Sequence, residues 1–405
     1  MKIENRITER KKDFIPYGHQ WIDDEDISAV INVLRSDWLT TGPLVGKFEE
    51  AFADFMNAKE AVAVSNGTAA LHAAMYALKI GPGDEVIVPS MTFAATANCV
   101  VFQGGIPVFA DVDPDTLLID PSQVEAKITP RTKAVIAVDY AGHPCDYDAL
   151  RLIAGRNGIA LVADACHALG ARYKDHPTGS LADLNVFSFH PVKHITTGEG
   201  GMITTNDPAF DRAMRTFRNH GITSDHRERS IRGSWFYEMV DLGYNYRLTD
   251  FQCALGMCQL KKLSGWIARR QEIARHYNKT FSGIEHIAPL RVCPEVLHAY
   301  HLYVVRINFK ALGNDRAELF RKMRKEDIGI NVHYIPVHLH PFYRQKFHTG
   351  PGLCPVAEKA YEQILSLPMF PGMTDEDVER VITAIIETTS ELPRIKGQDI
   401  RKKKK

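Results

Sequence analysis

A lysine that follows a short apolar segment is the first group in this sequence that indicates chemistry. Residues 186–189 form the segment, and Pro191 ends it because proline has no N–H to continue a strand. Lys193 comes next, followed by the glycine-rich residues 198–201. A lysine held in a pocket at such a turn has a lowered pKa, because burial disfavours the ammonium. Its neutral amine can then attack a carbonyl carbon.

A carboxylate at the end of a second apolar segment gives this lysine a partner. Residues 159–163 are typical of a buried parallel strand, and Asp164 follows them. Ligands of open α/β sheets bind outside the carboxyl ends of the strands, so two adjacent ends would present an acid and an amine together. Pyridoxal phosphate needs a lysine that bonds to its aldehyde and an acid that keeps its pyridine nitrogen protonated. Without Asp164, Lys193 would be interpreted as a solvated loop lysine.

A strand that turns directly into a helix predicts a phosphate site. Residues 61–65 are expected to form the strand, and residues 66–79 lead into the helix. Gly67 and Thr68 stand at the turn, where free N–H groups and the helix dipole attract an anion. The alternative is that Thr68 is an ordinary N-cap. The presence of Lys193 and Asp164 favours the phosphate.

Two longer motifs carry a resemblance to a known family. The signature of the fold-type-I, DegT-like nucleotide-sugar aminotransferases is similar to Asp164-Ala-Cys-His-Ala-Leu-Gly and to Phe187-Ser-Phe-His-Pro-Val-Lys-His-Ile-Thr-Thr-Gly-Glu-Gly-Gly. The resemblance covers residues 15–391. It is strongest to members that aminate C4 of a UDP-linked 4-keto-6-deoxy-N-acetylhexosamine on the route to pseudaminic acid. It implies pyridoxal 5′-phosphate as cofactor, L-glutamate as amino donor and a nucleotide sugar as acceptor.

The resemblance also implies roles for individual residues, with Lys193 and Asp164 as the catalytic pair. The residues implied to bind the cofactor are Gly67, Thr68, Phe93, Asp164, His167, Ser188, Lys193 and Asn245. Those implied to bind the sugar nucleotide are Tyr17, Leu39, Thr40, His333 and Tyr334. Phe93 and His167 would face the cofactor ring, with His167 alternatively bonded to its phenolic oxygen. Asn245 would reach the cofactor phosphate of the neighbouring subunit, so the active site would be complete in a homodimer.

Some of these residues also have a plainer interpretation. On sequence alone, Phe93 fits a core phenylalanine equally well, and Asn245 fits a turn. His333, His338 and His340 invite a metal hypothesis, but zinc prefers three or four ligands at defined spacing, and we expect no metal.

Seven strand-like segments indicate the fold class. They are residues 61–65, 85–89, 106–110, 133–138, 159–163, 186–189 and 202–205. Their alternation with helical stretches favours a mostly parallel sheet covered on both faces. With the resemblance, this predicts an α/β, aspartate-aminotransferase-like fold (fold type I) with a seven-stranded sheet and a smaller C-terminal α+β domain. The expected division is a polar arm (1–14), a large cofactor-binding domain (15–250), the small domain (251–393) and a basic tail (394–405).

Apolar periodicity predicts several further elements. A first helix near residues 23–34 would bury Ile27, Val30, Ile31 and Leu34. A second would bury Val45, Phe48, Phe52 and Phe55. The remaining expected elements are two long helices (248–263 and 266–282), two strands (301–309 and 329–337) and two amphipathic helices (355–365 and 374–389). The polar residues 218–242 are too long for a plain connection, which indicates a mobile or functional segment.

Composition limits the class of function. Lysine plus arginine equals aspartate plus glutamate at 49 each, so no overall charge favours nucleic acid or a membrane as partner. The seven scattered cysteines contain no Cys-x-x-Cys pair and are typical of reduced thiols, so we expect a cytoplasmic protein.

Other functions remain open at this level. Aminotransferases acting on UDP-4-keto-arabinose or on a dTDP-linked 3- or 4-keto sugar are alternatives. Relatives that dehydrate sugars at C3 have histidine in place of the lysine, so Lys193 argues against that activity. A non-catalytic regulator on the same fold would be expected to have lost Lys193 or Asp164, and both are present.

Overall fold

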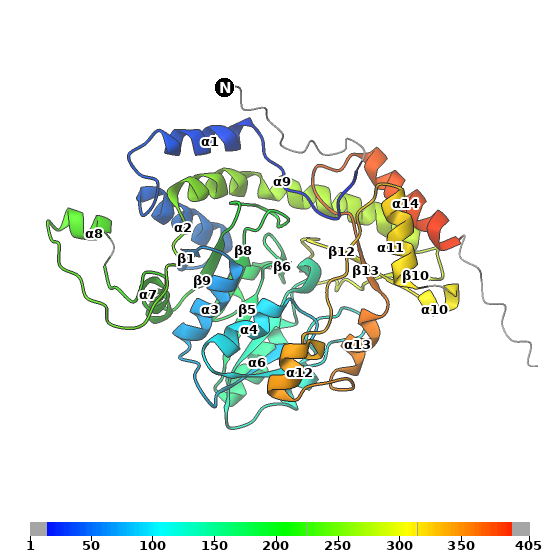
Figure 1. The fold of residues 1–405 in the computed structure, drawn as a ribbon, viewed down its shortest axis with the longest axis horizontal. Coiled ribbons are helices and arrows are strands. Elements are labelled where there is room, and N and C mark those ends of the chain that lie inside the picture. The colour runs from blue at the N-terminus through cyan, green and yellow to red at the C-terminus, as the bar shows by residue number, and fades with distance from the viewer. Residues whose placement is uncertain (1–13, 225, 314, 391–405) are drawn as a thin grey trace, which may run out of the picture.

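A seven-stranded sheet forms the centre of the computed structural model, which describes residues 14–224, 226–313 and 315–390 (Figure 1). The strands lie in the order β1 (Glu60–Val64), β9 (Gly201–Thr205), β8 (Leu184–Ser188), β5 (Ala160–Asp164), β4 (Thr132–Val138), β2 (Glu85–Pro89) and β3 (Ile106–Ala110). Strand β9 is antiparallel to both neighbours, and the other adjacent pairs are parallel. The predicted fold class is confirmed. Residues 1–13 of the predicted arm and the predicted tail lie outside the described residues.

Helices cover both faces of this sheet, as the alternation along β1 shows. Its two alanines pack in one core cluster with α2 (Pro43–Met56) and α9 (Asp250–Phe281). Its two valines pack in another cluster with α3 (Gly67–Ala77) and α4 (Ala94–Phe102). Because successive strand residues point to opposite faces, a strand covered on both sides is apolar at every position.

A second sheet lies in the C-terminal part of the chain. Strands β10 (Ile287–Pro289), β12 (Tyr303–Ile307) and β13 (Ile364–Leu367) pair antiparallel and share a core with α11 (Arg316–Lys325) and α14 (Asp375–Ser390). Helix α9 contacts α1 and α2 as well as β10 and α14, so it links the two sheets (Figure 1). The expected domain boundary coincides with the start of α9, and the division into domains stays a prediction.

The remaining elements connect or flank those already described. In chain order they are α1 (Asp24–Leu34), α5 (Pro121–Glu125), η1 (Tyr140–Gly142), α6 (Tyr147–Asn157), β6 (Arg172–Tyr173), β7 (His176–Pro177), η2 (Thr178–Ser180), α7 (Pro208–Phe217), α8 (His226–Ile231), β11 (Val296–Leu297), α10 (Phe309–Leu312), η3 (Val337–Leu339), α12 (Pro341–Phe347) and α13 (Pro355–Tyr361). Helix α8, from the long polar stretch, projects at the left edge of Figure 1. No helix in the described part of the chain has the length and apolar character needed to cross a membrane.

Two predicted elements of the C-terminal part are wrong. Residues 329–337 do not form a strand, and only Asn331 makes an isolated bridge, to Ser366. The predicted helix at 355–365 ends at Tyr361, and the apolar residues after Gln363 form β13 instead. Short apolar runs fit a helix face and a buried strand equally well, and pairing with β12 decided this one.

The predicted break between two long helices is also wrong. Helix α9 continues through Ser264 and Gly265 over 32 residues. A glycine inside a helix costs only about 1 kcal/mol relative to alanine, which packing against α1, α2 and α14 offsets. In α2, Phe55 was expected to be buried but is exposed, whereas Phe48 and Phe52 are fully buried as predicted.

Helix α1 turns a different face inward from the predicted one. Ile27, Ile31 and Leu34 are 48%, 38% and 56% exposed, so the predicted inward stripe is wrong. The fully buried Asp26 docks the helix on α9 instead, accepting a 2.6 Å hydrogen bond from Gln259 Nε2. Because this polar contact sets the rotation of the helix, its apolar stripe stays open to solvent in the single chain.

A buried carboxylate ties the edge of the main sheet to its helices. Glu49 of α2 accepts a hydrogen bond from the backbone N–H of Ala63 in β1 at 2.9 Å. The same carboxylate pairs with Arg215 at 2.7 Å and with Arg218, in and just after α7. Burial opposes the charged carboxylate, but the two guanidinium charges outweigh it and lower the pKa of Glu49.

This geometry predicts that Glu49→Gln destabilises the fold. The amide keeps the shape, but it leaves Arg218 without an ion-pair partner among the described residues and Arg215 with Asp211 alone, so we expect the free energy of unfolding to fall by about 3 kcal/mol. Urea denaturation of the variant and of Glu50→Gln, an exposed neighbour, measures the effect. Equal midpoints for Glu49→Gln and Glu50→Gln would contradict the structural role of Glu49.

Candidate active site

One cavity of about 780 Å³ lies at the carboxyl ends of β5 and β8 and collects most of the predicted site residues. Those that line it are Tyr17, Gly67, Thr68, Phe93, Asp164, His167, Ser188, Lys193, His333 and Tyr334. Parallel strands end at the same edge of a sheet, which is why residues far apart in sequence meet there. The cavity therefore unites the acid, the amine and the predicted phosphate turn.

Asp164 is held in one orientation by hydroxyl groups behind it. It is the last residue of β5 and is buried. Thr96 donates a 2.7 Å hydrogen bond to Asp164 Oδ2, and Thr96 is itself 2.7 Å from the hydroxyl of Thr92. The backbone N–H of Cys166 donates to Asp164 Oδ1 at 3.3 Å. These hydrogen bonds fix the orientation of the carboxyl group.

Lys193 lies on the turn that leaves β8. Its backbone N–H donates to the carbonyl of His190 at 2.8 Å, which closes the turn. Its Nζ lies 3.4 Å from Nε2 of His301, a residue that the sequence did not single out. Burial lowers the pKa of Lys193, and the nearby Cys166 and Asp164 only partly oppose that shift. A larger share of the amine is therefore neutral than in a solvated lysine.

The N-terminus of α3 offers a binding site for an anion. Asn66 is the N-cap, and its side chain accepts a hydrogen bond from the N–H of Ala69 at 2.8 Å, so the alternative role of Thr68 as N-cap is excluded. The first N–H groups of a helix have no intrahelical acceptor. A Cβ on Gly67 would lie 2.9 Å from the Cβ of Ser188, so only glycine permits this close approach of helix and strand end.

His167 and Phe93 both line the cavity. His167 Nδ1 accepts a hydrogen bond from the N–H of Ala141 at 3.3 Å, and its Nε2 bonds the hydroxyl of Tyr334 at 2.9 Å. Both nitrogens thus have protein partners, which favours ring coverage over a bond to a phenolic oxygen. Phe93 is 58% exposed, so its interpretation as a core residue is wrong.

The predicted sugar-nucleotide residues fall into two groups. Tyr17, His333 and Tyr334 lie in the cavity, and His333 Nδ1 is 2.8 Å from the hydroxyl of Ser366. Burial lowers the pKa of His333 to about 3, so its imidazole is neutral. Leu39 and Thr40 lie outside the cavity on an exposed segment.

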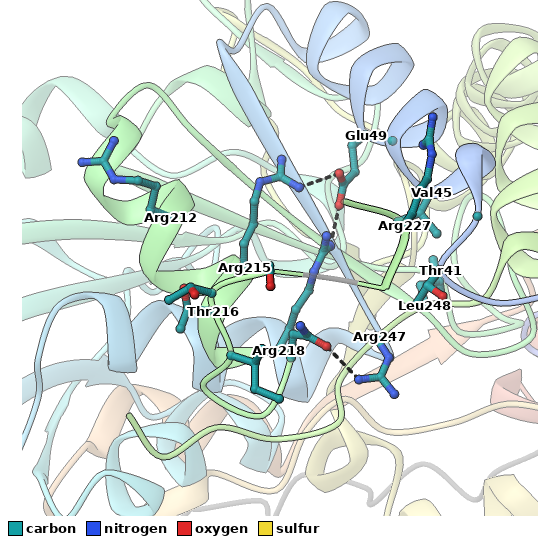
Figure 2. Close-up of a pocket in the computed structure, with 16 residues that line it drawn as sticks. Thr41, Val45, Glu49, Arg212, Arg215, Thr216, Arg218, Arg227, Arg247 and Leu248 are labelled. Atoms are coloured by element: carbon teal, nitrogen blue, oxygen red, sulfur yellow. Dashed lines mark hydrogen bonds and ion pairs between the residues drawn. The ribbon is translucent and has the colours of Figure 1, made fainter. Parts of the chain in front are cut away.

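Asn245 is likewise exposed and outside the cavity, next to a second cavity of about 470 Å³. Five arginines line this second cavity: Arg212, Arg215, Arg218, Arg227 and Arg247. Figure 2 shows Glu49 bonded to Arg215 and Arg218, and it is the one carboxylate among the described residues that line the cavity. The excess of positive charge suits an anionic ligand.

Sequence reasoning missed three residues of the main cavity region: Thr96, Tyr246 and His301. Thr92 and Thr96 are one helical turn apart after β2, a spacing that indicates two hydroxyls on one face. His301 and Tyr246 carry no local signal, because only tertiary contacts bring them to Lys193 and to α3.

Comparison with known proteins gives this geometry a context. Residues 20–386 match the profile of the DegT/DnrJ/EryC1/StrS aminotransferase family. The chain is 43% identical to the spore coat polysaccharide biosynthesis protein SpsC of Bacillus subtilis over 381 residues, which cover 94% of this chain and 98% of SpsC.

Two solved structures are similar over nearly the whole chain. The putative sugar aminotransferase Spr1654 of Streptococcus pneumoniae, known in forms with pyridoxal phosphate and pyridoxamine phosphate, has a TM-score of 0.88 and 32% identity, covering 94% of this chain and 100% of that one. PseC of Helicobacter pylori, an aminotransferase involved in pseudaminic acid biosynthesis, has a TM-score of 0.87 and 32% identity, covering 93% and 99%.

The residues present fit pyridoxal phosphate. The turn at Gly67 leaves no room for a side chain and offers backbone N–H groups to a phosphate. Asp164 offers an oriented carboxylate for the pyridine nitrogen, Lys193 offers a buried amine for the aldehyde, and His167 offers a ring face.

A second buried acid lies beside Asp164. Asp139 follows β4, and its backbone N–H donates to the carbonyl of Asp164 at 3.1 Å. Its Oδ1 accepts hydrogen bonds from the N–H of Cys145 and the hydroxyl of Tyr147, both at 2.9 Å, while Oδ2 has no partner among the described residues. Burial, with a smaller contribution from Asp164, raises the pKa of Asp139 to about 7.

Asp139→Asn should therefore change how stability depends on pH. The folded pKa lies above the unfolded value of about 4, so the stability that this carboxyl contributes is complete below pH 4 and is lost as pH rises from 4 to 7. In that range the loss is about 1.4 kcal/mol for each pH unit, and above pH 7 the carboxyl is ionised in both states and adds no further slope. Denaturation between pH 4.5 and 7 should show a steeper loss of stability with rising pH for the natural protein than for Asp139→Asn. Equal slopes would contradict the buried titration.

Proposed function

The chain belongs to the DegT/DnrJ/EryC1/StrS aminotransferase family of pyridoxal-phosphate-dependent sugar aminotransferases, and we propose that it moves the amino group of L-glutamate to C4 of a UDP-linked 4-keto-6-deoxy-N-acetylhexosamine. The observation that carries the proposal is the meeting of Lys193, Asp164 and the α3 N-terminus in one cavity. The form of the motif around Lys193, together with the similarity to PseC, supports the choice of sugar and carbon.

Each catalytic residue has a task that its environment supports. Pyridoxal phosphate, when bound, supplies an electron sink for the bond that breaks at the amino-acid carbon. Lys193 would take the proton from that carbon and pass it to the former aldehyde carbon of the cofactor, which requires the neutral amine that burial favours. Asp164, oriented by Thr96, keeps the pyridine nitrogen protonated through a charge-assisted hydrogen bond. The same residues act in reverse order when nitrogen is passed to the sugar ketone.

We assign the phosphate of the cofactor to Gly67, Thr68 and Ser188 of one chain and Asn245 of a second. A second copy would also explain the open apolar surface of the single chain. The large exposed apolar side chains in α1 and in the segment around α8 are Ile27, Ile31, Leu34, Ile231, Trp235, Phe236, Met239, Val240 and Leu242. Large exposed apolar side chains in such numbers are typical of a protein interface.

The arginine-lined second cavity supports the proposal that the substrates are anions. Thr41, which lines it, follows Thr40 in the sequence, and Arg247, which also lines it, lies two residues after Asn245. L-glutamate and a UDP sugar are both anions, and arginine binds carboxylates and phosphates with paired hydrogen bonds. All seven cysteines carry free thiols, which supports a cytoplasmic location, where sulfhydryls stay reduced.

A different keto sugar is the second candidate. The identity to SpsC, 43%, exceeds that to PseC, 32%, and SpsC is named for spore coat polysaccharide synthesis. UDP-4-keto-arabinose and dTDP-linked 3- or 4-keto sugars are the acceptors to compare. A non-catalytic role on this fold would leave Lys193 and Asp164 without a task.

The decisive experiment offers L-glutamate and a panel of these keto sugars to the protein loaded with pyridoxal phosphate. We expect L-glutamate to bleach the visible absorption band, and kcat/KM to be highest for the UDP-linked 4-keto-6-deoxy-N-acetylhexosamine. Lys193→Ala should abolish both, whereas Lys174→Ala, at the surface, should change neither. A faster reaction with another sugar would overturn the substrate, and normal turnover by Lys193→Ala would overturn the mechanism.

A mixing experiment tests the shared site. Lys193→Ala and Asn245→Ala homodimers should both be nearly inactive. In a mixed dimer, one site lacks both residues and the other is intact, so random mixing restores about a quarter of the natural activity if a second chain completes the site. No recovery in a solution shown to contain mixed dimers would mean that Asn245 acts within its own chain.

A further inference from the structure

A histidine that has no assigned role lies against the reacting amine. His301 lines the main cavity, is almost fully buried and has its Nε2 3.4 Å from Lys193 Nζ. Its ring centroid lies 4.4 Å from that of His167 and 5.6 Å from that of His194. His301 Nδ1 has no hydrogen-bond partner among the described residues. Among the described residues, the Lys193 amine is therefore the polar contact of the His301 ring nitrogens.

The backbone around His301 is fixed by several independent contacts. The preceding Tyr300 has φ +47°, a left-handed backbone conformation that residues other than glycine rarely adopt. Ala299 N donates to the carbonyl of Gly142 at 2.9 Å, and Leu302 N donates to the carbonyl of Ala141 at 3.2 Å. A Cβ on Gly142 would lie 3.0 Å from His301 N, so the turn after β4 touches this segment directly.

A buried arginine holds the same segment from the other side. Arg270 of α9 donates through Nη1 to the carbonyls of Tyr300 at 3.0 Å and Met369 at 2.9 Å. Its Nε and Nη2 have no partner among the described residues. The strained φ, the unpartnered arginine nitrogens and the unpartnered histidine nitrogen each cost stability. Such features persist where the surrounding structure enforces them, and they concentrate at functional sites.

Burial, together with the charges around Lys193 and His301, keeps the histidine neutral. The titratable groups that act on Lys193 or on His301 are Asp164, Cys166, His167, His194, Arg270 and His333. Burial lowers the pKa of His301 well below its ordinary value, and the positive charges of Lys193 and Arg270 add to the shift. A neutral imidazole with its proton on Nδ1 offers the Nε2 lone pair to an N–H of the lysine.

We propose that His301 is a further catalytic residue, whose Nε2 accepts a hydrogen bond from the Lys193 amine and supports it while it takes up and gives back a proton. The inference rests on the proposed role of Lys193 and adds a second residue to it. With one N–H held by His301, the lone pair of the neutral amine points into the cavity. When the amine accepts the substrate proton, the resulting ammonium keeps this bond.

The proton balance is closed within the lysine. One proton would move from the amino-acid carbon to Nζ, and one proton would leave Nζ for the former aldehyde carbon of the cofactor, so His301 gains and loses none. A charged histidine would repel the ammonium, and an apolar side chain would leave it unsolvated. The buried neutral imidazole avoids both costs.

The test compares His301→Leu, which removes the acceptor, with His301→Gln, whose side-chain oxygen replaces Nε2. Lys193 carries a free amine in the pyridoxamine phosphate form and in the cofactor-free full chain. Its acylation by acetic anhydride can therefore be followed by mass spectrometry against pH in either state. Because a lost hydrogen bond to an ammonium disfavours that charge, we expect the midpoint to fall by about one pH unit in His301→Leu. His301→Gln should stay near the natural protein.

The half-reaction with L-glutamate deuterated at Cα supplies a second readout. His301→Leu should slow the proton transfer by about tenfold and increase the isotope effect, because the amine becomes a weaker and less well-oriented base. KM for L-glutamate should stay unchanged, and His301→Gln should recover most of the rate. The matched control is His298→Leu, a buried histidine of the same segment whose Nδ1 accepts a hydrogen bond from Tyr300 N.

The outcomes separate this inference from the proposed function. If His298→Leu shifts the Lys193 midpoint as far as His301→Leu, His301 supports the segment only, and the inference is overturned. An unchanged midpoint and unchanged isotope effect in His301→Leu overturn it as well, while Lys193→Ala remains inactive. If Lys193→Ala transaminates normally, the proposed function fails first, and the role of His301 fails with it.

Discussion

The parallel pairing of β5 with β8 is the constraint on which the active site depends. Its register sets Asp164 beside Val186, so the acid at the end of β5 and the turn that leaves β8 lie at one edge of the sheet. Strand β9 pairs with β8 and also approaches the start of α3. A Cβ on Gly201 of β9 would lie only 2.5 Å from the carbonyl oxygen of Asn66. One ladder of hydrogen bonds therefore brings an acid, an amine and a helix N-terminus to the same cavity.

Removal of water gives these groups their chemistry. Burial lowers the pKa of Lys193 and of the surrounding histidines, and it raises the pKa of Asp139. The cavity region thus favours neutral forms of most of its titratable groups. Asp164 is oriented by two protein donors, the hydroxyl of Thr96 and the backbone N–H of Cys166. A cavity that combines a neutral amine with an oriented carboxyl group is suited to proton transfer.

The single chain leaves part of its surface without a packing partner. The apolar stripe of α1 and the aromatic side chains around α8 are exposed, and the exposed Asn245 lies outside the main cavity. Arg227 of α8 lines the arginine-rich cavity. The proposed second copy of the chain would account for the apolar surface, the exposed asparagine and the excess of positive charge together.

Local sequence patterns determined the fold class, the seven strands of the main sheet and the groups at their ends. Lys193, Asp164 and Gly67 were found because each follows an apolar strand, and such a pattern depends on neighbours in the chain alone. Only the tertiary structure decided the rotation of α1, the continuity of α9 and the strand at Ile364–Leu367. The buried Asp26 set the rotation of α1, packing at both ends kept α9 continuous, and pairing with β12 formed the strand. Each of these contacts overrode the local periodicity. His301 and Tyr246 were missed for the same reason, since a contact between distant residues leaves no periodic trace in the sequence.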